Sequence, residues 1–86
     1  MPANTTCTLV ITAKDTMTVL PRCLQILSRR GCKLTALTTG TLPNAEVVMR
    51  CTILAPGRWQ EPLIKLLERI VDVRHVELET APETLS

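Results

Sequence analysis

The stretch from Lys14 to Lys33 constrains the fold most, because it holds one complete amphipathic helix between a polar turn and a glycine stop. Apolar residues recur there at helical spacing and form one face: Val19, Leu20, Cys23, Leu24 and Leu27. Polar residues form the opposite face: Thr18, Arg22, Gln25 and Arg29. A helix with one apolar face must bury that face against another element. We expect the rest of the chain to supply a sheet for this purpose.

The ends of this helix carry their own signals. Thr18 is the predicted N-cap, since its side chain can accept a hydrogen bond from the first helical turn. Pro21 is expected in that first turn, where no backbone donor is lost. Gly31 can adopt the left-handed conformation that ends a helix. These signals predict a helix over about 19–30.

Four segments are predicted to be strands. From Cys7 to Lys14, apolar and polar residues alternate, which is typical of a half-buried strand. The other three run over Lys33–Thr39, Glu46–Leu54 and Val71–Glu79. Residues 40–45 are the turn between the second and third strands, and Gly40 is counted among its turn residues. This short connection predicts an antiparallel hairpin.

A second helix is predicted from Arg58 or Trp59 to about Ile70, after a turn over 55–57. Pro62 must lie in its first turn or before its start. The order β-α-β-β-α-β predicts an α+β, ferredoxin-like fold: a four-stranded antiparallel sheet with both helices on one face. The other sheet face is expected to hold Thr8, Val10, Thr12, Val48, Arg50 and Thr52, and its apolar members suggest an oligomer or partner surface.

The 86 residues suffice for one small domain, placed at residues 7–80, with a flexible N-terminus over 1–6 and a tail over 81–86. Neither a signal peptide nor an apolar run of about 20 residues is present, so we expect a cytoplasmic protein without a membrane partner. The net charge is only +2, and Trp59 is the single Phe, Trp or Tyr residue. Both facts argue against nucleic-acid binding by base stacking.

The sequence contains no recognisable catalytic or metal motif. The cysteines Cys7, Cys23, Cys32 and Cys51 have no Cys-x-x-Cys spacing, so we interpret them as reduced core residues rather than as a metal or redox site. The only histidine, His75, is expected on the solvent side of a strand. The nearby carboxylates Asp72, Glu77 and Glu79 are expected at a solvated edge.

Several segments, taken in order, resemble one family. They are Val19-Leu20-x-Arg22 leading to Arg29-Arg30-Gly31, the strand around Leu34–Leu37, and Ile70-Val71-Asp72-Val73-x-His75-Val76. Together they resemble the short form of the regulatory small subunit of acetolactate synthase, also called acetohydroxyacid synthase, which contains an ACT domain.

This resemblance implies a non-catalytic subunit that binds and activates the large catalytic subunit. That partner is expected to carry thiamine diphosphate, magnesium and FAD, whereas this chain carries no cofactor. It also implies a homodimer through sheet edges, with an amino-acid effector at the interface. The alternative is a free-standing ACT-type amino-acid sensor that regulates another enzyme, and a small nucleic-acid-binding protein is a third possibility.

The resemblance places the effector site at Asp15, Thr16, Met17, Thr18, Val19, Lys33 and Leu34. Here the sequence departs from the family pattern. Asp15 stands at an asparagine position, Thr18 at a glycine position and Lys33 at a second asparagine position. Thr18 adds a side chain where a ligand carboxylate approaches backbone N–H groups, and Asp15 repels that carboxylate. We therefore expect weak or absent valine binding. Candidate contacts with the large subunit are Arg22, Arg29 and Arg30, with Met17 and Leu42 at exposed turns.

Overall fold

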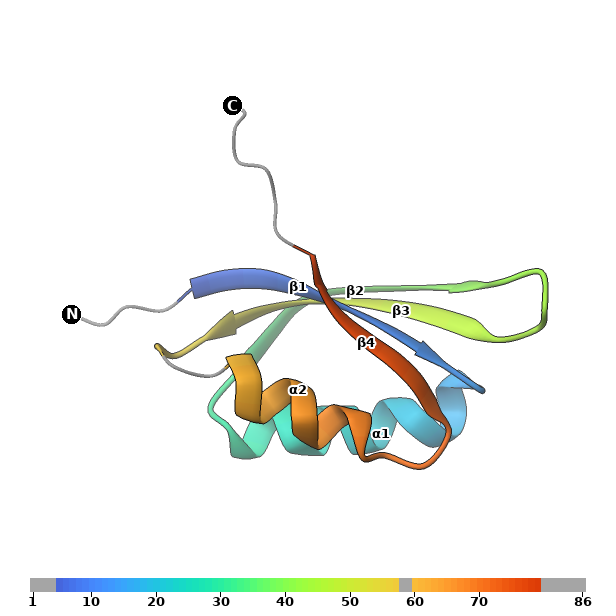
Figure 1. Cartoon of the computed structure of the whole chain (residues 1–86). Helices are drawn as coiled ribbons and strands as arrows, with labels where there is room; N and C mark the ends of the chain where they lie inside the picture. The colour runs from blue at the N-terminus through green and yellow to red at the C-terminus, as the bar shows by residue number, and fades with distance from the viewer. Residues whose placement is uncertain (1–4, 58–59, 80–86) are drawn as a thin grey trace.

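The computed structural model describes residues 5–57 and 60–79. Its elements are β1 (Thr5–Ala13), α1 (Thr16–Arg29), β2 (Lys33–Thr41), β3 (Val47–Ala55), α2 (Gln60–Glu68) and β4 (Val73–Glu79). The strands form one antiparallel sheet in the order β2-β3-β1-β4. Both helices cover the same face of this sheet (Figure 1). The predicted ferredoxin-like βαββαβ fold is confirmed.

The core lies between the sheet and the helices, and the alternation of the strands produces it. On β1 and β3, every second residue points to the helices; the fully buried ones include Leu9, Ile11, Met49, Cys51 and Ile53. From the helices, Val19, Cys23, Leu27, Leu63 and Leu67 pack against them. Burying one large aliphatic side chain stabilises a fold by about 2 kcal/mol, so this aliphatic layer suffices without a described aromatic residue.

The start of α1 differs from the prediction. The N-cap is Asp15, not Thr18, and the helix begins at Thr16. Pro21 is therefore inside α1 and not in its first turn. The missing N–H of Pro21 would have bonded the carbonyl of Met17. Met17 is 86% exposed, so this part of α1 lies at the surface, where a missing backbone hydrogen bond costs less than in a buried helix.

The end of α1 follows the prediction. Gly31 has φ of 76°, in the left-handed region. Its N–H donates to the carbonyl of Ser28 (3.1 Å), and the N–H of Cys32 donates to the carbonyl of Leu27 (2.9 Å). This pair of bonds is the Schellman arrangement, which satisfies the last carbonyls of a helix. Cys32 and Leu27 both belong to the core, so the stop also fixes the direction in which β2 begins.

Other boundaries moved by a few residues. β1 begins at Thr5, so residues 5 and 6 of the predicted loose N-terminus belong to a strand, and β2 extends through Gly40, which is a strand residue and not a turn residue. β4 starts at Val73 rather than Val71, because Asp72 turns the chain with φ of 79°. Pro62 lies in the first turn of α2. The predictions for Arg58, Trp59 and the tail over 81–86 concern residues outside the described ranges.

Among the described residues, no helix or strand covers the sheet face opposite the helices (Figure 1). Thr8 and Thr52 share a hydrogen bond across β1 and β3 (3.1 Å). Arg50 on β3 pairs with Glu79 on β4, and so spans the central strand β1. The Nε of Arg74 is 2.8 Å from Oε2 of Glu46, before β3, which makes a second such pair. The exposed charges of this face are therefore largely matched with one another.

Candidate effector site and association edge

The predicted effector site begins at the N-terminus of α1, and Asp15 already occupies the binding position for an anion there. Oδ1 of Asp15 accepts a hydrogen bond from the backbone N–H of Thr18 (2.7 Å). The first N–H groups of a helix and its dipole attract negative charge. A second carboxylate, such as that of an amino acid, would meet the Asp15 charge at this end.

The other residues predicted around this turn divide by exposure. Val19 is fully buried in the core. It is therefore a packing residue and cannot contact a ligand. Met17 is almost fully exposed, and it lies in the first turn of α1 rather than in a loop. Thr16 is half-buried and Thr18 is exposed. Only Asp15, Thr16, Met17 and Thr18 can therefore contact a ligand at this end.

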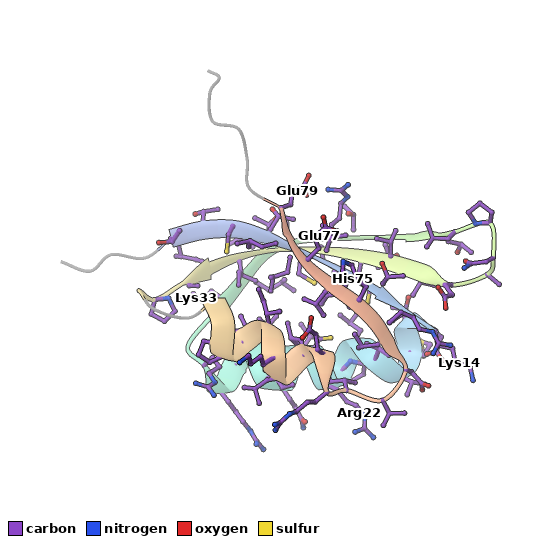
Figure 2. All side chains as sticks on the ribbon, in the orientation of Figure 1. Lys14, Arg22, Lys33, His75, Glu77 and Glu79 are labelled. Carbon is purple, nitrogen blue, oxygen red and sulfur yellow. The ribbon has the colours of Figure 1, made fainter. Side chains whose placement is uncertain are left out.

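The second part of the predicted site, Lys33 and Leu34, lies beyond the other end of α1. Figure 2 shows Lys33 at the opposite end of the molecule from Lys14, which precedes Asp15. The helix between them has 14 residues, or about 21 Å at 1.5 Å per residue. One copy of the chain therefore does not bring the two halves of the predicted site together.

The two edges of the sheet differ in a way that sequence reasoning did not identify. Edge strand β2 has no buried residue and carries no charge after Lys33. Edge strand β4 carries Arg74, His75, Glu77 and Glu79. Charged side chains protect an edge from pairing with another strand, whereas a long uncharged edge favours pairing. The strand order of the sheet, which reveals this contrast, depends on tertiary contacts.

Exposed leucines lie beside the β2 edge. Leu34 and Leu24 are each 37% exposed. Leu34 pairs with the buried Ile53 and so lies on the helix side of the sheet. Viewed from its N-terminus with the sheet above, the right-handed α1 turns Leu20 and Leu24 to the right, toward β2 (Figure 1). A strand edge and an apolar strip are thus adjacent on one side of the molecule.

The predicted partner contacts are on the surface. Arg22, Arg29 and Arg30 are exposed, and Figure 2 shows that Arg22 points away from the sheet. Leu42 is half-buried in the turn between β2 and β3, where its N–H donates to the carbonyl of Glu46 (2.7 Å). The turn around it is exposed, as predicted, but Leu42 itself is partly covered.

The cysteines are free thiols. Burial raises the pKa of the Cys23 thiol to about 12, with a further contribution from the nearby Cys51. Burial alone raises the pKa of Cys51 to about 11, and it is also the main reason that the pKa of Cys7 rises to about 11. Since the thiolate is the reactive form, these side chains are poor nucleophiles at neutral pH.

The other described titratable groups considered in the sequence analysis lie on the surface. His75 is exposed, and its Nε2 lies 3.4 Å from Oε1 of Glu77. Glu79 pairs with Arg50 on the uncovered face. Within residues 5–57 and 60–79, no three His, Cys, Asp or Glu side chains are arranged to hold a metal ion. No helix in the same residues is long and apolar enough to span a bilayer.

Comparison with solved structures identifies the fold. The C-terminal domain of the MgtC protein from Mycobacterium tuberculosis superimposes with a TM-score of 0.77 at 16% identity, over 91% of this chain and 88% of that chain. The ACT domain from the GTP pyrophosphokinase of Chlorobium tepidum gives 0.69 at 11% identity, over 90% of this chain and 100% of that chain. No protein-family model and no curated sequence matches this chain. The chain therefore has an ACT-like fold.

Proposed function

We propose that this ACT-like chain is a non-catalytic regulatory domain, and more specifically the activating small subunit of a cytoplasmic acetolactate synthase in branched-chain amino acid biosynthesis. The sequence segments around Arg22, Gly31 and His75 resemble that family, and the ACT-like fold agrees with it. One observation carries the proposal: the edge strand β2 has no buried residue and no charge after Lys33, and exposed leucines lie beside it, which suits association.

In this proposal the chain forms a homodimer through β2. Antiparallel pairing of two β2 strands reverses one copy relative to the other. Lys33 of the second copy would then lie at the level of the N-terminus of α1 in the first. The dimer would assemble the two halves of the effector site that a single chain keeps apart.

The assembled site would bind valine weakly or not at all. The Asp15 carboxylate caps α1 at the place where the carboxylate of an amino acid would bind. Lys33 from the second copy would offset part of this repulsion. The Asp15 carboxylate would still occupy the position at the N-terminus of α1. The subunit would therefore activate its partner with little feedback by valine.

Reconstitution tests this proposal. The purified chain is added to its cognate acetolactate synthase large subunit, and acetolactate formation is measured with and without valine. A severalfold rise in rate that valine leaves intact is the expected result. The triple variant Asp15→Asn/Thr18→Gly/Lys33→Asn should make the activated enzyme sensitive to valine, whereas Lys14→Asn, which removes a neighbouring charge, should not.

Other outcomes are equally informative. If valine abolishes the activation by the unmodified chain, the subunit role stands and the interpretation of Asp15 is wrong. If the chain neither activates nor co-purifies with the large subunit, the subunit role is wrong. A free-standing amino-acid sensor then becomes the better description, and calorimetry with a panel of amino acids would identify its ligand.

A further inference from the structure

The outer surface of the helix layer carries a row of cations. Arg22 and Arg29 are exposed on α1, seven residues apart and so on one side of that helix. Lys65 on α2 and Arg69 just after it are also exposed, and they are four residues apart. We call these four side chains the basic seam; the two helices that carry them lie side by side (Figure 1).

The direction of each helix places these side chains at the seam. With the sheet above, α1 turns Arg22, Ile26 and Arg29 toward α2, on the side opposite Leu24. The antiparallel α2 turns Leu66 and Arg69 toward α1, and Lys65 points directly away from its buried face. Ile26 and Leu66 are half-buried between the helices, and the cations stand outside them.

The charges of the seam are unmatched among the described side chains. The ion pairs of the described residues join Arg50 to Glu79, Arg74 to Glu46 and His75 to Glu77, all away from the helix layer. Glu68 lies on the side of α2 that faces away from α1. The uncovered sheet face thus pairs its own cations, while the helix face presents its cations to solvent.

We propose that the basic seam is a docking surface for a carboxylate-rich segment of a partner protein. Two rows of arginine and lysine on parallel axes can hold acidic side chains from both sides, and arginine binds a carboxylate through two hydrogen bonds. The identity of the partner rests on the proposed function, which makes it the synthase large subunit; the acidic chemistry of the contact rests only on the seam.

A protein fits this surface better than a nucleic acid. Proteins that bind single strands usually add several aromatic side chains on which bases stack, and this chain has a single Phe, Trp or Tyr residue, Trp59. Nucleic-acid binding at physiological salt also draws on many phosphate contacts, whereas the net charge of the whole chain is only +2. A few arginines spaced along two helices suit a short acidic segment.

Charge reversal tests the seam. Binding of the full chain to the purified large subunit is measured by biolayer interferometry for the wild type, Arg22→Glu, Arg22→Glu/Arg69→Glu and the control Lys14→Glu. The double variant should weaken binding by about tenfold or more, and the control should bind like the wild type. Circular dichroism establishes that each variant is folded, as expected for exposed, unpaired cations.

A second arm separates the seam from the proposed function. Fluorescence anisotropy measures binding of a labelled poly-glutamate peptide and of a labelled single-stranded RNA to the same variants. Peptide binding that Arg22→Glu/Arg69→Glu removes supports the seam even where the large subunit does not bind. Equal binding of the large subunit by wild type and double variant overturns the seam and leaves the proposed function intact. RNA binding stronger than peptide binding, or no peptide binding at all, also overturns it.

Discussion

At the scale of single residues, Asp15 both starts a helix and shapes a ligand site. Its carboxylate accepts a hydrogen bond from the backbone N–H of Thr18. This bond satisfies a donor that has no partner within α1. The same carboxylate places negative charge where the carboxylate of an amino-acid effector would bind. The cap that stabilises the fold is thus also the reason to expect a weak response to amino acids.

Replacing Asp15 by alanine should therefore destabilise the protein. We expect Asp15→Ala to lower the free energy of unfolding by about 1 kcal/mol, because the cap and its charge at the helix N-terminus are both lost. Asp15→Asn keeps an acceptor oxygen and should lose only a fraction of that. Urea unfolding of both variants measures the difference. Equal stability of the alanine variant and the wild type would show that Asp15 does not cap α1 in solution.

The buried thiols predict a loss of stability at alkaline pH. The pKa of Cys51 rises from its ordinary value of 9.0 to about 11 in the folded chain. The neutral form is favoured by folding, so this contribution is complete below pH 9 and is lost as the pH rises toward 11. In that window the free energy of unfolding should fall by about 1.4 kcal/mol per pH unit for this thiol.

Urea unfolding from neutral pH to about pH 10 measures this slope. Cys51→Ala should be less stable at neutral pH, because it loses buried contacts, but its stability should decline less steeply with pH. Lysine ionisation affects both proteins alike and cancels in the comparison. Identical slopes would mean that Cys51 is not kept neutral by the fold.

At the scale of elements, the sequence predicts the interior of each element better than its ends. The faces of β1 and α1 follow from alternation and helical spacing, because burial of Leu9 or Cys23 dominates their energies. The start of α1 was predicted three residues too late. Both Thr18 and Asp15 can cap, and Pro21 favoured the later start, since proline prefers a first turn. The exposed position of this first part of α1 lets the longer helix tolerate the proline.

The stop of α1 predicts a contrast between two glycines. Gly31 has φ of 76°, and a Cβ there would lie 3.9 Å from Cγ of Pro56, an ordinary contact. Gly31→Ala should therefore cost about 1 kcal/mol through backbone strain alone. Gly40 lies in β2 without positive φ, and its added Cβ would lie 3.9 Å from Cγ1 of Val48. Gly40→Ala should be neutral or slightly stabilising. Thermal unfolding of the two variants checks the contrast, and a Gly31→Ala variant as stable as wild type would contradict it.

At the scale of the whole molecule, association is what the sequence predicts least. The run from Leu34 to Thr41 is visibly free of charge, but only the strand order makes it an edge. The separation of Asp15 from Lys33 likewise depends on the direction of α1 and on the layer it forms. Local patterns do not encode which side of the sheet is left unpaired.

The proposed β2 dimer predicts which leucines matter. Leu24→Glu/Leu34→Glu should weaken dimerisation by at least about tenfold, because charges replace the apolar strip beside the edge. Both residues are partly exposed, so the fold should persist. Lys65→Glu alters an exposed residue of α2, the helix that packs against the opposite edge strand β4, and should leave the dimer intact. Sedimentation velocity over a range of concentrations measures this, and a double variant that dimerises like wild type would exclude the β2 edge.

The strand order also has a consequence for folding speed. β1, the first strand to be synthesised, lies between β3 and β4 in the sheet, so each of its neighbours comes from later in the chain. Only the β2–β3 pair can form from residues that are close in sequence. Long loops must close before the centre of the sheet exists, and chains with such contacts fold in milliseconds or slower. A β2–β3 hairpin that formed during that delay would expose both of its edges, and the charge-free run of β2 would be open to pairing with other chains.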